Sequence, residues 1–365
     1  MALIDEVNEK RMEIRTDGYP MSIGEWISLY EKDELDIHPE FQRFYRWDDF
    51  QKSSLIESIL LGIPIPSIFV TQRQDGVWDV VDGLQRLSTI FQMLGILKDE
   101  KGMPVTPLVL SGTKYLPSLK DVRWDNPKNP KNEIPQEAKL LFKRSKISVN
   151  IILKESDENA KYDLFQRLNT GGSKLSPQEV RNCLMVMLND KLYKWIKELA
   201  SYENFKQCIA LSDSSLEEAY DIELVLRFVV FLGMADNDLK NIGDVGIFLT
   251  EKMSDIAHQK KFPKTKYEEI FKKTFDTLFD SVGSDAFKRY NKVKQRHEGG
   301  FLLSQYEVVA LGLASNITTL LPTINISTKI KSIWSNTLYT NWAGSGITAT
   351  RRLPRIIPLG RELFQ

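Results

Sequence analysis

A β-hairpin that runs directly into a helix constrains the fold of this chain more than any other sequence feature. Ser67–Val70 and Trp78–Val81 are rich in β-branched and aromatic residues, and Asp75-Gly76 between them is typical of a tight hairpin turn. The second strand ends in Asp82-Gly83, and from Leu84 to Leu97 apolar residues recur at helical spacing. The sequence therefore predicts a unit of two strands followed at once by a helix.

Similar patterns predict further elements on both sides of this unit. An aspartate within Trp47–Phe50 can cap a helix that ends near Gly62, and Ile147–Leu153 alternates as a strand does. A helix is expected over Ser156–Leu168. Ser176-Pro177-Gln178-Glu179 is a capping box with proline at the first helical position, so another helix is expected to begin there.

Strand signals fade after Arg181, and the later windows with apolar residues at helical spacing are 217–232, 266–291, 301–318 and 324–336. We therefore expect an α+β protein with an α/β domain over residues 1–185 and a mostly helical domain over residues 186–365. The stretch from about 98 to 144, rich in Pro, Gly, Asn and Lys, is expected to be a long insertion or flexible excursion. A length of 365 residues also favours two domains over one.

The composition excludes several classes of protein. The chain has 49 basic and 49 acidic residues, so its bulk charge predicts no polyanionic partner, and any contact with nucleic acid needs a local patch. The two cysteines, Cys183 and Cys208, lack the spacing of a zinc site and are expected to be reduced and buried. The N-terminus has no sustained apolar region, so no signal peptide is expected, and no apolar run approaches the length of a membrane span. We expect a cytoplasmic protein with no membrane partner.

The turn at Asp82–Arg86 is a candidate anion site. Free backbone N–H groups and the positive end of the helix dipole point at such a strand–turn–helix corner. Gln85 and Arg86 lie in the first helical turn, where they can hold phosphate oxygens, and Asp82 can cap the helix, bind a divalent metal or position a water. Taken alone, the pattern is more typical of a plain capped turn with a surface arginine, because Asp-Gly turns are common.

Two other clusters carry similar residue types. Arg43 and Arg46 alternate with aromatic residues between Pro39 and Trp47, which suits base stacking and phosphate binding but equally suits a strand with its aromatic side in the core. Asn169-Thr170-Gly171-Gly172 offers polar groups and close backbone approach.

The three clusters together, in this order, resemble the DUF262 family, which is related to the N-terminal half of the GmrSD-type modification-dependent restriction enzymes. The resemblance covers roughly residues 20–185 and rests on FQRFYRWDDFQKSSLIESILLGIPIPSI (Phe41–Ile68), DGLQRLST (Asp82–Thr89) and FQRLNTGGSKLSPQEVRNC (Phe165–Cys183). It implies a ParB/sulfiredoxin-like fold. The family signature has Gln and Thr where this chain has Leu84 and Ser88.

The resemblance implies nucleotide binding, often with hydrolysis, in bacterial defence against phage or foreign DNA. The candidate catalytic residues are then Asp82, Gln85 and Arg86, with Asp82 as the metal ligand for Mg²⁺ and an NTP of unknown base as the cofactor. The candidate nucleotide-binding residues are Arg43, Arg46, Gly83, Gln85, Arg86, Ser88, Asn169 and Arg181. The alternative is a non-enzymatic module in which the same corner binds a DNA backbone phosphate or recruits a partner.

Many family members carry a C-terminal HNH nuclease domain, for which this chain shows no signature. His38, His258 and His297 lack metal-ligand spacing, so we expect no nuclease activity of its own. Two basic runs in the C-terminal half are candidate DNA contacts, although such runs are more often solvated helix faces. The residues concerned are Lys288, Arg289, Lys292, Arg351 and Arg352. The candidate partners are a nucleotide, DNA, a separate nuclease or effector protein, and a second copy of the chain.

Overall fold

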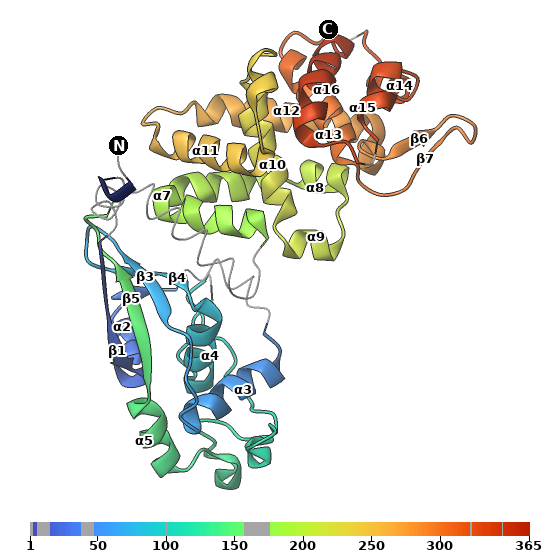
Figure 1. Ribbon diagram of the computed structural model, residues 1–365. Coiled ribbons are helices and arrows are strands. Elements are labelled where there is room, and N and C mark those ends of the chain that lie inside the picture. Colours follow the sequence, from blue (N-terminus) through green and yellow to red (C-terminus); the bar gives the residue numbers. More distant parts are fainter. Residues whose placement is uncertain are drawn as a thin grey trace. The chain divides into compact units, whose positions relative to one another are not determined.

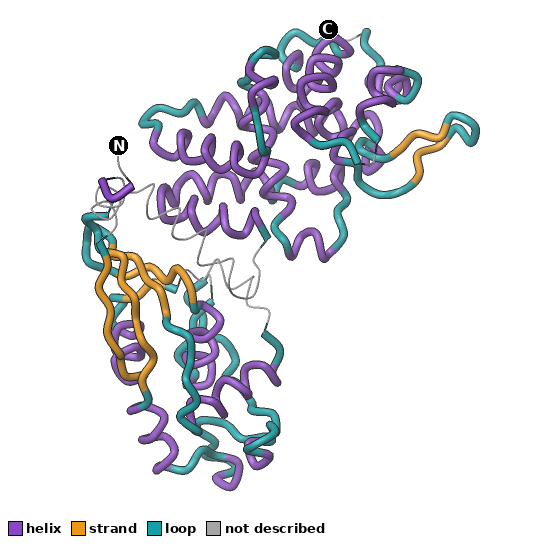
Figure 2. Tube along the Cα trace, viewed as in Figure 1, coloured by secondary structure: helices purple, strands orange, loops and turns teal. Residues whose placement is uncertain are grey.

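The computed structural model describes residues 3–5, 15–37, 47–99, 101–156, 176–321, 323–344 and 346–365. The chain divides into two compact units, Met1–Leu175 and Ser176–Gln365. Figure 1 shows the elements of each unit, and Figure 2 shows that strands dominate one half of the first unit while the second is mostly helical. The α+β class expected from the sequence is confirmed.

The first unit is built on a five-stranded mixed sheet in the order β1-β5-β3-β4-β2. Its elements are β1 (Thr16–Ser22), α2 (Ile23–Glu31), β2 (Leu35–Asp36), α3 (Asp49–Leu60), β3 (Ile68–Gln72), β4 (Trp78–Asp82), α4 (Leu84–Leu94), the 3₁₀ turns η2 (Pro117–Leu119) and η3 (Pro130–Asn132), α5 (Gln136–Arg144) and β5 (Lys146–Ile152). β3 pairs antiparallel with β4 and parallel with β5.

The predicted hairpin and its helix are present. β3 and β4 pair from Gln72↔Trp78 onward, and the register shifts between Phe69 and Val70. Helix α4 follows β4 after a single residue and buries Leu87, Ile90 and Phe91. Because apolar residues recur on that face, the helix is held against the rest of the unit by burial and needs no cap of its own. The Phe91 ring stacks on Tyr30 of α2 with 4.3 Å between ring centroids.

The stretch from 98 to 144 differs from the expected flexible excursion. It has little regular structure, yet Leu108, Leu110, Leu119 and Trp124 are each buried in the core of the first unit. Pro and Gly prevent long elements here, but the apolar residues between them still supply enough burial to fix the backbone. The segment is therefore a packed layer of the unit.

The second unit consists of helices and one small hairpin. Its elements are α7 (Pro177–Ala200), α8 (Glu203–Ile209), α9 (Asp213–Glu217), α10 (Tyr220–Leu232), η4 (Asp238–Asn241), α11 (Val245–His258), α12 (Lys264–Val282), η5 (Gly283–Asp285), β6 (Arg289–Asn291), β7 (Arg296–Glu298), α13 (Leu303–Asn316), α14 (Ile326–Ile333), α15 (Thr337–Trp342) and α16 (Ala349–Leu363).

Helix α7 sets the boundary between the units earlier than the sequence suggested. The capping box is present as predicted, since the Ser176 hydroxyl accepts the N–H of Glu179 and the Glu179 carboxylate accepts the N–H of Ser176. The helix continues well beyond residue 185, where we expected the domain boundary, and bends at Asn189, whose backbone is not helical. A boundary at 185 would cut this helix, so the second unit begins at Ser176.

The window 266–291 is also divided differently from the expected helix. Helix α12 ends at Val282, and Arg289–Asn291 forms strand β6, which pairs with β7. The basic run after residue 287 therefore lies on a β-hairpin, and not on a helix end.

The core of the second unit is rich in aromatic rings. Phe205, Phe228, Phe271 and Phe275 contact one another through ring centroids 4.5 to 5.9 Å apart. Both cysteines are buried, as expected, and neither forms a disulfide. Within the described part of the chain, no helix is long and apolar enough to cross a membrane.

Helices α13 and α16 cross with their backbones in direct contact. A Cβ placed on Gly312 would lie 2.4 Å from the backbone of Gly360, and one placed on Gly360 would lie 2.1 Å from the carbonyl oxygen of Val308. Only glycine allows two helices to approach this closely. Pro354 and Pro358 lie inside α16, so packing on α13 compensates for the backbone hydrogen bonds that the prolines cannot donate.

Candidate functional site

The candidate site lies at the end of β4, where the chain turns into α4. Gly83 makes this turn in the left-handed region, with φ 100° and ψ 11°. A Cβ at this position would meet Cδ1 of Ile68 at 2.2 Å, and 3.2 Å would separate it from Nη2 of Arg86. Both the backbone angles and the space require glycine, so the corner is closed tightly against β3.

The first turn of α4 presents its backbone donors without a side-chain cap. The N-cap position is Gly83, which has no side-chain oxygen to accept hydrogen bonds from the N–H groups of the first turn. Leu84, Gln85 and Arg86 are each partly exposed. N–H groups without a side-chain cap, combined with the positive helix end, favour an anion at this point.

Arg86 is held in a fixed orientation beside this turn. Its Nη2 donates to Oδ2 of Asp82 at 2.7 Å, and its Nη1 donates to the carbonyl oxygen of Pro66 at 2.7 Å. The Arg86 side chain is 11% exposed and the Asp82 side chain 33%. Asp82 is therefore the partner of Arg86 and not the helix cap, and the guanidinium is anchored at the corner before any ligand arrives.

Ser88 differs from the role expected from the sequence. It is fully buried in α4, and its hydroxyl has no hydrogen-bond partner among the described residues. One helical turn separates it from the N-terminus, and the helix turns its side chain into the core, away from any ligand at the surface. We therefore correct the expectation that Ser88 contacts a nucleotide.

A metal at this site would have one protein carboxylate. Within the described residues, no group of three or more His, Cys, Asp or Glu side chains is placed to hold a metal ion. Asp82 is half-buried and uses Oδ2 for Arg86. Mg²⁺ commonly binds through one or two carboxylates together with substrate phosphates and water. Asp82 fits that pattern only if phosphates supply the other ligands.

Three of the predicted nucleotide-binding residues, Arg43, Arg46 and Asn169, lie outside the described residues. Arg181 lies within them, but its place differs from the expectation. It is 3% exposed on α7 and donates to Gln178 at 2.7 Å and to Glu223 at 2.6 Å. A guanidinium used in this way supports the core of the helical unit, so the structure gives Arg181 a structural role.

The buried ion pairs continue from Glu223 across the helical unit. Arg227 of α10 bridges Glu223 and the fully buried Glu307 of α13, and Arg352 of α16 donates to both oxygens of Glu307. Each carboxylate thus lies between two guanidinium groups, which satisfies most of its acceptor sites. The network joins four helices.

Arg352 was one of the predicted DNA contacts. We correct this expectation, because Glu307 neutralises the charge of Arg352 inside the unit. Lys288 pairs with Asp285 at 2.9 Å. Arg289, Lys292 and Arg351 are exposed.

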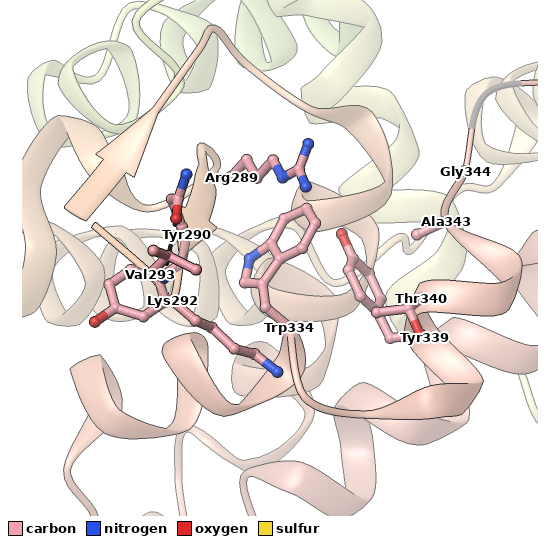
Figure 3. Close-up of a pocket in the computed structure, with 10 residues that line it drawn as sticks. Arg289, Tyr290, Lys292, Val293, Trp334, Tyr339, Thr340, Ala343 and Gly344 are labelled. Carbon is pink, nitrogen blue, oxygen red and sulfur yellow. Dashed lines mark hydrogen bonds between the residues drawn. The ribbon is translucent and has the colours of Figure 1, made fainter. Parts of the chain in front are cut away.

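The sequence reasoning missed a pocket beside Arg289 and Lys292. It has a volume of about 560 Å³, and Trp334 and Tyr339 from α14–α15 contribute its aromatic lining (Figure 3). Trp334 lies 45 positions after Arg289 in sequence, so spacing alone gives no signal for it. The nearest available signal is the co-occurrence of a basic run and a later Trp and Tyr.

Comparison with known proteins finds a family that covers most of the first unit and the start of α7. Residues 23–186 match the model of the family described as GmrSD restriction endonuclease, N-terminal domain. The resemblance stated from the sequence is thereby confirmed over these residues, and it indicates a protein of a restriction-type defence system. No curated protein and no solved structure matches the chain.

Proposed function

We propose that the Asp82–Arg86 corner binds the phosphates of a nucleoside triphosphate, and that the protein hydrolyses this nucleotide as part of a restriction-type defence system. The observation that carries the proposal is the anchored Arg86 guanidinium beside an uncapped helix N-terminus. The match to the GmrSD N-terminal domain supports the same function.

The geometry suits phosphate for three reasons. The helix N-terminus offers backbone N–H donors, the guanidinium offers charge-assisted ones, and the two lie within one helical turn. Arg86 is already oriented by Asp82 and Pro66, so little side-chain entropy is lost on binding. Gln85 stands beside Arg86 in the same turn and can contribute a further hydrogen bond.

For hydrolysis, positioning and charge neutralisation supply most of the catalysis of phosphoryl transfer. Asp82 would hold Mg²⁺ against the phosphates or orient the attacking water. We expect Asp82→Asn to reduce phosphate release more than nucleotide affinity, because the amide keeps the shape but loses the charge. Release of inorganic phosphate with and without Mg²⁺ measures the first effect, and titration calorimetry measures the second.

Titration of the full chain with ATP, GTP, CTP and UTP tests binding. We expect at least one NTP to bind, and Arg86→Ala to weaken that binding by about ten-fold or more, as for loss of a charge-assisted hydrogen bond. Arg144→Ala is the matched control, because Arg144 is an exposed arginine of the same unit at the end of α5. Its affinity should equal that of the wild type.

Arg86→Ala also removes the bonds to Asp82 and Pro66, so its stability must be measured alongside. Because the side chain is mostly buried, we expect a loss of about 1–3 kcal/mol, more than for an exposed arginine. Arg86→Lys, which keeps the charge but cannot donate in a fork, should bind with intermediate affinity. Unchanged NTP affinity in folded Arg86→Ala would contradict the proposal. Duplex DNA binding that depends on Arg86, with no heat from any NTP, would assign the corner to a DNA phosphate.

A further inference from the structure

The β6–β7 hairpin of the second unit is a short ribbon with a fixed tip. Figures 1 and 2 show it extending away from the neighbouring helices of its unit. The side chain of Asn291 organises the turn, since its Oδ1 accepts the N–H groups of Val293 and Lys294 at 3.0 Å and its Nδ2 donates to Glu298 at 2.7 Å. The tip residue Val293 is 94% exposed. The tip of the ribbon therefore has a defined shape and is exposed.

The charges on the hairpin are mainly positive. Lys294 is paired with Glu298 at 3.4 Å, whereas Arg289, Lys292 and Arg296 are exposed. No ion pair within the described residues engages the guanidinium of Arg289 or the ammonium of Lys292. Both side chains line a pocket that the hairpin shares with Trp334 and with residues of α15.

The pocket has the size and lining of a site for a planar group. Its volume of about 560 Å³ lies in the range of small-molecule sites. Figure 3 shows Trp334 in the middle of the lining residues, with Arg289 on one side and Lys292 on the other. Tyr339 packs edge-on against Trp334 with 5.3 Å between centroids, and the Arg289 guanidinium is 5.9 Å from the Trp334 ring.

The polar groups that line this pocket favour a ligand with negative charge. Two cations and no carboxylate belong to the described residues that line it. The indole Nε1 of Trp334 is buried and has no acceptor within the described part of the chain. An anionic ligand would be attracted by both cations, whereas the indole nitrogen has no exposed surface and would take no part in binding.

We propose that this pocket and the hairpin bind single-stranded nucleic acid, with one unpaired base stacked on Trp334 and the adjoining phosphates held by Arg289 and Lys292. Aromatic rings next to basic side chains are the usual means of binding single strands without sequence preference. A duplex keeps its bases stacked inside and cannot offer a planar face to Trp334. An acidic peptide would use the cations but not the ring. The site is separate from the nucleotide corner at Arg86, which lies in the other unit.

The test uses the full chain and a fluorescein-labelled twelve-residue oligothymidylate, with fluorescence anisotropy as the readout. We expect Trp334→Ala to weaken binding by about ten-fold, as for loss of one stacked base, and Trp334→Phe to restore part of it. We expect Lys292→Ala to weaken binding and to reduce the slope of log affinity against log salt by about 0.7. Lys261→Ala, at an exposed lysine of the same unit, is the matched control and should change neither quantity by as much.

The same assay separates the alternative ligands. A duplex of the same length, labelled in the same way, should bind more weakly than the single strand. The affinity for this duplex should not depend on Trp334. Equal binding of duplex and single strand, with no effect of Trp334→Ala and Trp334→Phe, would overturn the proposal. So would saturable binding of thymidine monophosphate without binding of the oligonucleotide. Arg86→Ala should leave oligonucleotide affinity unchanged, so failure here and failure at the nucleotide corner are distinguishable.

Discussion

Neighbouring residues of one motif have opposite environments in this protein. Arg86 is anchored beside an exposed helix end, whereas Ser88, two positions later, is fully buried. Arg181 belongs to another of the motifs that point to the family, yet its guanidinium lies among the core helices of the second unit. A motif therefore contains both ligand-facing positions and positions that hold the fold.

We expect Ser88→Ala to leave nucleotide affinity unchanged and to keep or raise the free energy of unfolding, by up to about 1 kcal/mol. The reason is that the hydroxyl is buried without a partner among the described residues, and alanine also has the higher helix propensity. Urea denaturation measures this change. Thr89→Ala provides the comparison, because the Thr89 hydroxyl donates to the carbonyl oxygen of Gln85 at 2.7 Å and its loss should destabilise. A loss above about 1 kcal/mol for Ser88→Ala would show that the hydroxyl has a partner.

The sequence predicted the tight corner because Asp-Gly followed by helical periodicity is a local signal. It could not predict that Asp82 pairs with Arg86 instead of capping α4, since that depends on where β3 brings the carbonyl of Pro66. For the same reason it could not separate exposed Arg289 from neutralised Arg352.

At the scale of elements, Glu57 fixes the irregular segment 98–144 to helix α3. Its Oε1 accepts hydrogen bonds from the Thr113 hydroxyl at 2.5 Å and from the N–H groups of Tyr115 and Leu116 at 2.8 and 2.9 Å. These bonds, the one from Thr113 first, lower the pKa of the Glu57 carboxyl. In addition to apolar burial, one side chain of α3 thus holds residues 113–116 of a segment that has few helices or strands.

We expect this contact to make part of the stability depend on pH. Because the pKa of Glu57 is lower in the folded than in the unfolded protein, the ionised form stabilises the fold above an unfolded pKa of about 4.3, and the contribution is lost as the pH falls through the folded pKa. Glu57→Gln should therefore destabilise the protein at pH 7 and destabilise it less at pH 3. Thermal unfolding at both pH values measures the difference. Exposed Glu137, replaced by Gln, should show a smaller effect; equal behaviour of the two variants would contradict the assignment.

Elements with strong local signals were predicted, and those that depend on partners were not. The capping box at Ser176 and the β3–β4 hairpin are present as expected. Strand β1 contains Gly and Pro and is mostly exposed, so it carries no alternation of its own and exists through pairing with β5. Helix α16 contains two prolines, which disfavour a helix in isolation, and it was not predicted because it depends on packing against α13.

At the scale of the whole molecule, each unit has its own core. The first is built around the mixed sheet, and the second around the aromatic cluster and the ion pairs that join α7, α10, α13 and α16. Because α7 carries Arg181, residues 176–185 contribute to the stability of the helical unit.

We therefore expect a fragment of residues 176–365 to fold cooperatively, and one of residues 186–365 to be less stable. The shorter fragment lacks Arg181, which leaves Glu223 with one partner fewer, and breaking a buried ion pair costs about 3–5 kcal/mol. Circular dichroism during urea denaturation measures the difference. Within the longer fragment, Arg181→Ala should reproduce much of the loss. Equal midpoints for the two fragments would show that the first turns of α7 contribute nothing to this unit.

The crossing of α13 and α16 limits how the sequence of this protein can change over time. Most tight contacts can be relieved by a smaller residue on the opposite side, so a substitution at one position is rescued at another. At Gly312 and Gly360 the opposing atoms belong to the main chain, which every amino acid shares. No second substitution can make room there. Descendants that keep this crossing must therefore inherit both glycines unchanged, and mutational drift is confined to the helix faces around them.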